Sequence, residues 1–296
     1  MSRAVAASGF KRLVRFTNSK FPDRIRVGQP LSDSIDVGLA VAKGEQVHVA
    51  LFSGRSVLSP GEPTGDTTTI SHLYSPIARH ETNTIRCIGL NYRSHAEEVK
   101  LLIPSTPSLF LKPSTCLADP WPTAPSILPR ITRQHDCGDY EAELAVILGA
   151  DAKNVPEETA LDYVLGYTAA NDISSRTPQF WTSQWDFSKG FDGSCPIGPT
   201  VVSKELIPDP GKLRLRGILN GNTMQDCGTD DLIFSVSKLV AFLSQGTTLP
   251  AGTVILTGTP AGVGMSRKLS LKAGDEFHAC IEPYVGTLIN RFGDEV

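Results

Sequence analysis

Several common features are missing from this sequence, and each absence argues against a class of protein. No apolar stretch within the 296 residues approaches the roughly 20 residues that a membrane-spanning helix needs. The six cysteines are scattered without any Cys-x-x-Cys pair, which argues against a structural zinc site and against a disulfide framework. Aromatic residues make up only 7% of the chain, and the formal net charge is −3. We therefore expect neither nucleic acid nor a membrane among its partners.

The N-terminal region is basic and allows two interpretations. The first 22 residues carry five lysines and arginines but no acidic residue, which is a feature of mitochondrial transit peptides. The alternative is a short disordered tail that leads into a strand at Lys11–Thr17. The compartment therefore stays open between the cytoplasm and the mitochondrion.

Residues 10–80 are expected to form a small β domain. Short strand-like segments there are separated by turn residues, and Gly44 between Ile35–Val41 and Gln46–Phe52 indicates a hairpin. Residues 75–84 have the character of a linker. The sequence therefore predicts two domains, one at residues 1–80 with a flexible start and the other at residues 81–296.

The second domain is expected to contain many strands and few helices. Strand patterns include Tyr140–Leu148 and Gly166–Ile173, with a helical stretch at Glu157–Val164 between them. Another helix is predicted at Phe234–Ser244, where apolar residues recur at helical spacing. The resulting fold class is α+β and β-rich, with irregular crossings between strands.

Two glutamates open the strongest strand pattern. Side chains alternate between the faces of a strand, so Glu141 and Glu143 point the same way, about 7 Å apart. The same face continues as Ala145 and Ile147, which are core residues in character. Carboxylates on such a face are costly to bury unless a positive charge pairs with them. A solvated strand end is the alternative interpretation.

Asp172 strengthens the interpretation of the two glutamates as metal ligands. It lies in the second strand pattern, one residue before its end, and this pattern follows the first after one intervening helix. Neighbouring strands joined in this way can place their ends side by side. Three carboxylates without a nearby histidine or cysteine favour a hard cation, so the sequence predicts Mg²⁺, with Mn²⁺ as the alternative.

A histidine and a glutamate share one face of a predicted short helix. His95 and Glu98 are three residues apart, close enough for a carboxylate–imidazole hydrogen bond that would make a general base. Ser94 and Glu97 have the spacing of a capping box at the start of this helix. An exposed helix with ordinary polar residues is the alternative. A proline-rich segment follows, and together the two could act as a lid.

These motifs together resemble the fumarylacetoacetate hydrolase family. Six blocks match in order and spacing, and they span about residues 85–292. They are Ile88–Glu98, Phe110–Ser114, Tyr140–Val146, Asn171–Arg176, Lys189–Pro199 and Ile255–Gly264. The N-terminal run Arg12–Phe16 is similar to the fumarylacetoacetate hydrolase domain-containing protein 2 subgroup, though less specifically.

The resemblance implies a fold and a set of site residues. The family fold is a β-roll-like mixed barrel preceded by a small N-terminal domain, commonly in a homodimer. Residue by residue, the matched motifs imply metal ligands, a catalytic group and a substrate-binding group. They are, in that order, Glu141, Glu143 and Asp172; His95, Glu98 and Lys189; and Arg176, Gly258 and Thr259.

The implied chemistry is an enolate reaction of a small 2-oxo carboxylate. A divalent cation polarises a keto oxygen and so stabilises an enolate. The same enolate serves hydrolysis of a β-diketone, tautomerisation and decarboxylation, and the motifs do not choose among these outcomes. Two departures from the family pattern, at Cys227–Thr229 and Thr177–Pro178, argue against fumarylacetoacetate itself. The expected substrate is oxaloacetate or an acylpyruvate. A larger diketo acid, or metal–carboxylate binding without turnover, is the alternative.

Overall fold

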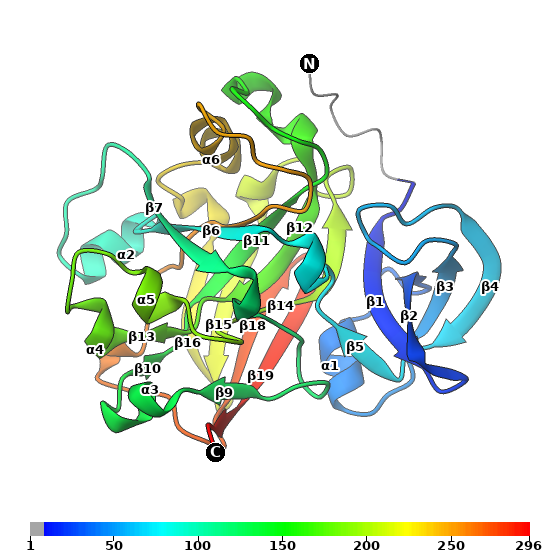
Figure 1. Cartoon of the computed structure of the whole chain (residues 1–296), viewed down its shortest axis with the longest axis horizontal. Coiled ribbons are helices and arrows are strands. Elements are labelled where there is room, and N and C mark those ends of the chain that lie inside the picture. The colour runs from blue at the N-terminus through cyan, green and yellow to red at the C-terminus, as the bar shows by residue number, and fades with distance from the viewer. Residues whose placement is uncertain (1–8) are drawn as a thin grey trace.

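The computed structural model describes residues 9–296. Residues 9–78 contribute five strands and one α-helix, which lie at the right of Figure 1. The predicted flexible start falls on residues 1–8, outside the described residues. In chain order, these elements are β1 (Arg12–Asn18), β2 (Phe21–Pro30), α1 (Val37–Ala42), β3 (His48–Phe52), β4 (Pro63–Thr69) and β5 (His72–Tyr74).

The expected hairpin across Gly44 is wrong, because its first arm is the helix α1. Asp36 caps this helix, since its carboxylate accepts a hydrogen bond from the Leu39 amide at 3.1 Å. Val37 and Ala40 are buried, three residues apart on one face of the helix. An apolar spacing over so short a stretch fits a strand or a helix, and in this case the cap and the packing give a helix.

The main sheet runs through both predicted domains. Its strand order is β4-β3-β2-β1-β14-β12-β11-β17-β6-β7, so β1 links the N-terminal strands to the central ones. The boundary between residues 80 and 81 stays a prediction. The further strands are β6 (Thr84–Gly89), β7 (Ser108–Pro113), β11 (Ala142–Leu148), β12 (Val164–Asn171), β14 (Cys195–Ser203) and β17 (Val254–Leu256).

A second sheet of five strands packs against the middle of the first. Its order is β16-β15-β18-β19-β9. One core cluster joins Leu144 of the main sheet to Phe277 and Leu288 of the second sheet, and Tyr140 stacks on Phe277 with 4.6 Å between ring centroids. The strands are β9 (Ser126–Leu128), β15 (Arg214–Leu219), β16 (Asn222–Gly228), β18 (Glu276–Glu282) and β19 (Gly286–Asp294).

Helices are short and few, which confirms the predicted β-rich α+β fold. The stretch expected as a helix at Glu157–Val164 is a 3₁₀ helix, η3 (Glu157–Tyr163). Both large sheets are mixed, and within residues 9–296 each runs between two edge strands and closes into no barrel. The remaining α-helices are α2 (Arg93–Glu98), α3 (Arg130–Gln134), α4 (Arg176–Gln179), α5 (Asp186–Lys189) and α6 (Val236–Leu243).

Very short elements connect the larger ones. None of the helices in the described part of the chain is long and apolar enough to cross a membrane. The short strands are β8 (Leu117–Ala118), β10 (Gly138–Asp139) and β13 (Ser174–Ser175). The other 3₁₀ helices are η1 (Arg79–Glu81), η2 (Ser114–Cys116), η4 (Pro210–Lys212), η5 (Thr229–Asp231) and η6 (Met265–Arg267).

Antiparallel pairing of β11 with β12 decides where functional side chains meet. Ala142 pairs with Asn171, so residue 141 before β11 and residue 172 after β12 lie at the same end of the sheet. The Asp172 amide donates to the Glu141 carbonyl at 2.9 Å and extends this pairing by one step. Parallel strands would have put the start of one and the end of the other at opposite ends.

The packing between the two sheets predicts a large cost for truncating Leu144. This side chain is fully buried in the main core cluster. Leu144→Ala should lower the free energy of unfolding by about 2–5 kcal/mol, the range for leucine-to-alanine changes in protein cores. Urea denaturation would measure it. The control is Leu102→Ala, because Leu102 is 94% exposed; its effect should stay within about 0.5 kcal/mol, and equal effects of the two changes would contradict the described core.

Candidate metal centre and active site

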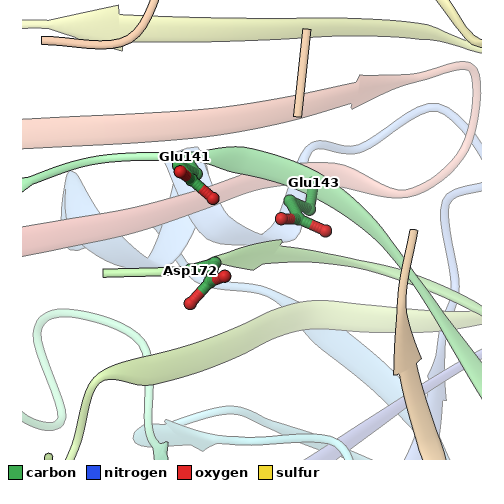
Figure 2. Close-up of side chains that lie close together, drawn as sticks. All are labelled: Glu141, Glu143 and Asp172. Carbon is green, nitrogen blue, oxygen red and sulfur yellow. The ribbon is translucent and has the colours of Figure 1, made fainter. Parts of the chain in front are cut away.

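Three buried carboxylates converge at the paired ends of β11 and β12. Glu141, Glu143 and Asp172 each offer an oxygen within 4.8 Å of the others, and each residue is at most 6% exposed. Figure 2 shows the three side chains turned toward a common space between the strands. The interpretation of Glu141 and Glu143 as a solvated strand end is therefore wrong.

Three cationic side chains of the protein form ion pairs with members of this triad. The Lys189 ammonium donates to Glu141 Oε2 and to Asp172 Oδ2, at 2.9 Å each. Lys112 donates to Asp172 Oδ1 from the other side, and Arg176 Nη2 lies 2.7 Å from Glu141 Oε1. Each of these cations is almost completely buried, which is costly unless it is paired.

Lys112 was assigned no role from the sequence. It lies on β7, where only Phe110 and Lys112 are buried, so both face inward at two-residue spacing. Its ammonium also donates to the Ser194 carbonyl at 2.8 Å. In the sequence, only the two-residue spacing of Phe110 and Lys112 within a matched motif indicates that Lys112 faces inward. Its partner Asp172 is 60 residues away in the chain.

The charges of the triad are unevenly compensated. Burial acts to raise the pKa of Glu141, but Lys189 and Arg176 outweigh it and bring the pKa to about 2. Glu143 has a pKa well above its usual value, because burial and the charges of Asp172 and Glu141 all oppose its ionised form. Its Oε2 accepts a hydrogen bond from the Gly258 amide, which offsets only part of this effect.

The residues present fit a hard divalent cation. All three converging groups are carboxylates, and such oxygen donors suit Mg²⁺ or Mn²⁺ better than zinc. A dication would add positive charge beside Glu143, where the charge of Lys189 does not outweigh burial and two negative neighbours. The triad could therefore hold a divalent metal ion.

The loop after β17 approaches the triad closely. Gly258 has a φ of +98°, and a Cβ there would meet Asn91 Cβ at 2.8 Å, so only glycine fits. Thr259 is engaged with the protein, because its hydroxyl donates to the Ala142 carbonyl at 2.9 Å and accepts from Gln225 Nε2 at 2.7 Å. A role of either residue in binding substrate stays a prediction.

The predicted histidine–glutamate pair is present on α2. His95 Nδ1 lies 3.0 Å from Glu98 Oε2, and Glu98 Oε1 accepts from the Gly262 amide at 2.9 Å. The expected capping box is wrong. The helix begins at Arg93, the cap position belongs to Tyr92, and Ser94 lies inside the first turn.

Arg176 is bound almost entirely to protein groups. Its Nε donates to Asp139 Oδ2 at 2.7 Å, and its Nη1 donates to Gln179 Oε1 at 3.0 Å. Because Glu141 holds Nη2, a substrate carboxylate would have to share this guanidinium with two protein carboxylates. Its predicted role in substrate binding stays a prediction.

A cavity of about 370 Å³ reaches from Glu141 of the triad to His95 on α2. The helices α2, α4 and α5, which contribute His95, Arg176 and Lys189 to it, lie on the same side of the molecule (Figure 1). The rest of its lining is mainly apolar or aromatic. The apolar and aromatic residues are Ile88, Gly89, Leu90, Val99, Leu101, Phe110, Phe180, Trp185 and Met265, and two polar residues, Gln179 and Thr259, also line it.

The site and fold coincide with those of a known family. The family model described as Fumarylacetoacetate (FAA) hydrolase C-terminal matches residues 84–293. The chain belongs to the fumarylacetoacetate hydrolase family. The match spans the triad, the pair on α2 and the cavity between them, so the resemblance of the sequence motifs is confirmed.

Similar proteins in the fumarylacetoacetate hydrolase family are named after different activities. Caffeoylpyruvate hydrolase of Neonothopanus nambi is 41% identical, over 99% of this chain and 96% of its own length. The mitochondrial oxaloacetate tautomerase fahd2 of Xenopus laevis is 37% identical, over 89% of this chain and 85% of its own. A Mycobacterium smegmatis crystal structure, 5-carboxymethyl-2-hydroxymuconate delta-isomerase, superposes with a TM-score of 0.79 and 31% identity, over 96% of this chain and all of that one. This chain is an enzyme of the same family.

The uneven charges of the triad predict opposite stability effects of two matched substitutions. With a chelator present at about pH 7, Glu143→Gln should stabilise the protein, because burial and the neighbouring charges of Asp172 and Glu141 oppose the ionised carboxylate. The amide removes the opposed charge and keeps an acceptor for Gly258. Glu141→Gln should destabilise it, because Lys189 and Arg176 lose a carboxylate partner.

Urea denaturation across pH would test both signs. The raised pKa of Glu143 means that its cost exists above the unfolded value of about 4.3 and disappears below it. The lowered pKa of Glu141 means that its contribution is lost as the pH falls from about 4.3 toward about 2. Both differences from the unaltered protein should therefore shrink in acid. A destabilised Glu143→Gln variant at about pH 7 would contradict the described charge balance.

Proposed function

We propose that this enzyme hydrolyses an acylpyruvate, a 2,4-dioxo carboxylate, whose acyl group is apolar. Pyruvate and a carboxylic acid would be the products, and Glu141, Glu143 and Asp172 would hold a divalent cation beside the 2-oxo acid end. The observation that carries the proposal is the contrast within the cavity between one charged end and mainly apolar walls. The full-length similarity to caffeoylpyruvate hydrolase supports it.

The cavity is better suited to one carboxylate than to two. The lysine and the arginine that line it, Lys189 and Arg176, already form ion pairs with carboxylates of the protein. A second carboxylate placed against Leu90, Phe110 or Trp185 would lose its hydration without gaining a partner. An apolar acyl group in the same place would gain free energy from burial.

The aromatic wall is itself held in place. Trp185 packs edge-on against Phe110 with 5.6 Å between ring centroids. It also lies close to Gly89, where an added Cβ would meet the indole ring at 2.2 Å. This fixed wall supports a role in selecting the acyl group.

The cation, Lys189 and Lys112 would have different roles in the reaction. A divalent ion bound there would draw electron density from the keto oxygen and favour the enolate form of the substrate. Lys189 places a fixed positive charge at the same carboxylates, where it can donate a hydrogen bond to a substrate oxygen. Lys112 lies behind Asp172 and keeps that carboxylate in position.

His95 and Glu98 would activate the water. With Glu98 accepting from Nδ1, the other ring nitrogen of His95 is free to take a proton from a water molecule in the cavity. The hydroxide adds to the acyl carbonyl carbon, and the bond from that carbon to C3 breaks. The electron pair stays on the pyruvate fragment as an enolate, and a proton at C3 then gives pyruvate.

Tautomerisation or decarboxylation of oxaloacetate is the second candidate. Relatives named oxaloacetate tautomerase, such as those of Xenopus laevis and Bacillus subtilis, favour it. Proton transfer by His95 alone would serve tautomerisation. The proposed cation is Mg²⁺ with Mn²⁺ as the alternative, the proposed assembly is a homodimer, and the compartment is proposed to be cytoplasmic or mitochondrial. A larger diketo acid, or binding without turnover, would be the remaining alternatives.

Turnover of three acids would separate these candidates. Acetylpyruvate, benzoylpyruvate and oxaloacetate would each be incubated with the protein, with and without Mg²⁺, while enol absorbance and pyruvate release are followed. We expect metal-dependent release of pyruvate from both acylpyruvates, with the higher kcat/KM for benzoylpyruvate. Faster reaction of oxaloacetate than of either acylpyruvate would overturn the proposal in favour of the second candidate.

Removal of His95 should separate catalysis from metal binding. His95→Ala should lower kcat by about 10²–10⁴, the usual contribution of a general base. Mg²⁺ should still raise the Tm of this variant, because the triad is intact, whereas Glu141→Ala should lose turnover and the metal effect together. The matched control is His278→Ala, since His278 Nε2 pairs with Glu276 Oε1 at 2.8 Å outside the cavity. Full activity of His95→Ala would exclude the proposed base.

A further inference from the structure

The helix that carries His95 and Glu98 is too short to be stable by itself. α2 contains six residues, and isolated helices shorter than about 12 residues are marginal in water. Its own cap residue, Tyr92, makes no side-chain hydrogen bond to the first turn. The order of this helix must therefore come from contacts with distant parts of the chain.

One distant contact has the geometry of a helix cap. The carboxylate of Asp231 accepts a hydrogen bond from the Ser94 backbone amide at 2.9 Å, across 137 residues of sequence. Arg93 adds two bonds to the same segment, because its Nη1 donates to the Leu232 carbonyl at 2.7 Å and to the Asp231 carbonyl at 3.1 Å. A carboxylate at a helix N-terminus satisfies a free amide and complements the helix dipole.

Asp231 is held by its own surroundings. It ends η5, which is fixed to the preceding loop because Thr229 Oγ1 donates to the Pro210 carbonyl at 2.7 Å and accepts from the Leu213 amide at 2.9 Å. The thiol of Cys227 donates to Asp231 Oδ2 at 3.7 Å. The capping carboxylate is therefore held in position by contacts that do not involve α2.

The turn that enters α2 is fixed separately by Asn91. Its Nδ2 donates to the carbonyls of Thr257 and Phe234, at 2.7 and 3.1 Å, and its Oδ1 accepts from the Phe234 amide at 2.8 Å. Asn91 thus anchors the end of β6 and the turn, whereas Asp231 contacts the helix itself. Loss of the Asp231 carboxylate would leave the turn and the triad in place.

We propose that Asp231 is a positioning residue for the His95–Glu98 pair, which it serves by capping α2 from a remote part of the chain. The proposal rests on the proposed function for the reaction in which the pair takes part. It predicts that the Asp231 carboxylate sets the fraction of molecules in which His95 is placed for proton transfer. It also predicts no effect on the metal ligands, which lie on other elements.

The test compares two substitutions of Asp231 with a neighbouring control. Asp231→Ala removes the acceptor, and kcat should fall about tenfold with little change in KM, in line with the loss of one cap. Asp231→Asn keeps an acceptor oxygen for the Ser94 amide, so it should recover most of the loss. Asp230→Ala is the control, because Asp230 is an exposed carboxylate adjacent in sequence. Mg²⁺ should raise the Tm of all of these variants equally.

Hydrogen exchange separates this proposal from the proposed function. The amides of residues 93–99 should exchange several-fold faster in Asp231→Ala than in the unaltered protein or in Asp230→Ala, whether or not a substrate is turned over. Unchanged exchange in that segment would overturn the cap. Equal kcat of Asp231→Ala and the unaltered protein, or loss of the Mg²⁺ effect on Tm together with activity, would overturn the positioning role. Accelerated exchange in a protein that turns over none of the three acids would retain the cap and reject the proposed function alone.

Discussion

The burial of three like charges at one end of the β11–β12 pair is the constraint on which the rest of this structure depends. Carboxylates so close together and shielded from water repel one another, and each also loses its hydration. The chain offsets the cost with Lys112, Lys189 and Arg176, each brought from a different element. The helices α4 and α5 and the strand β7 therefore have to converge on this end of the sheet.

The compensation is unequal among the three carboxylates, and the inequality has a functional meaning. Glu141 forms ion pairs with two cations, whereas the Gly258 amide and the charge of Lys189 do not outweigh burial and two negative neighbours at Glu143. A site that neutralised all three carboxylates would be more stable and would attract a dication less strongly. Under the proposed function, the cost at Glu143 would represent stability given up for affinity toward a cation, as is common at functional sites.

Local patterns predicted more of the site than of the fold around it. Alternation placed Glu141 and Glu143 on one face, and helical spacing placed His95 beside Glu98, because both periodicities act within a few residues. The same reasoning read Ile35–Val41 as a strand, since so short an apolar pattern fits either structure and the deciding Asp36 cap is a single side chain. The contacts of Lys112 and Asp231 could not be predicted from local patterns, because their partners lie 60 and 137 residues away in the chain. The antiparallel direction of β11 and β12 likewise arises from the whole sheet.

The triad and the histidine pair do not by themselves choose the reaction, because an enolate beside a general base can lead to hydrolysis or to proton transfer. The choice belongs to what fills the rest of the cavity. Under the proposed function, walls such as Phe110 and Trp185 would favour an apolar acyl group over a second unpaired carboxylate. The named relatives include both hydrolases and tautomerases, so membership of the family does not by itself decide between these reactions. Specificity in this chain is therefore expected to depend on residues that touch neither the cation nor the transferred proton.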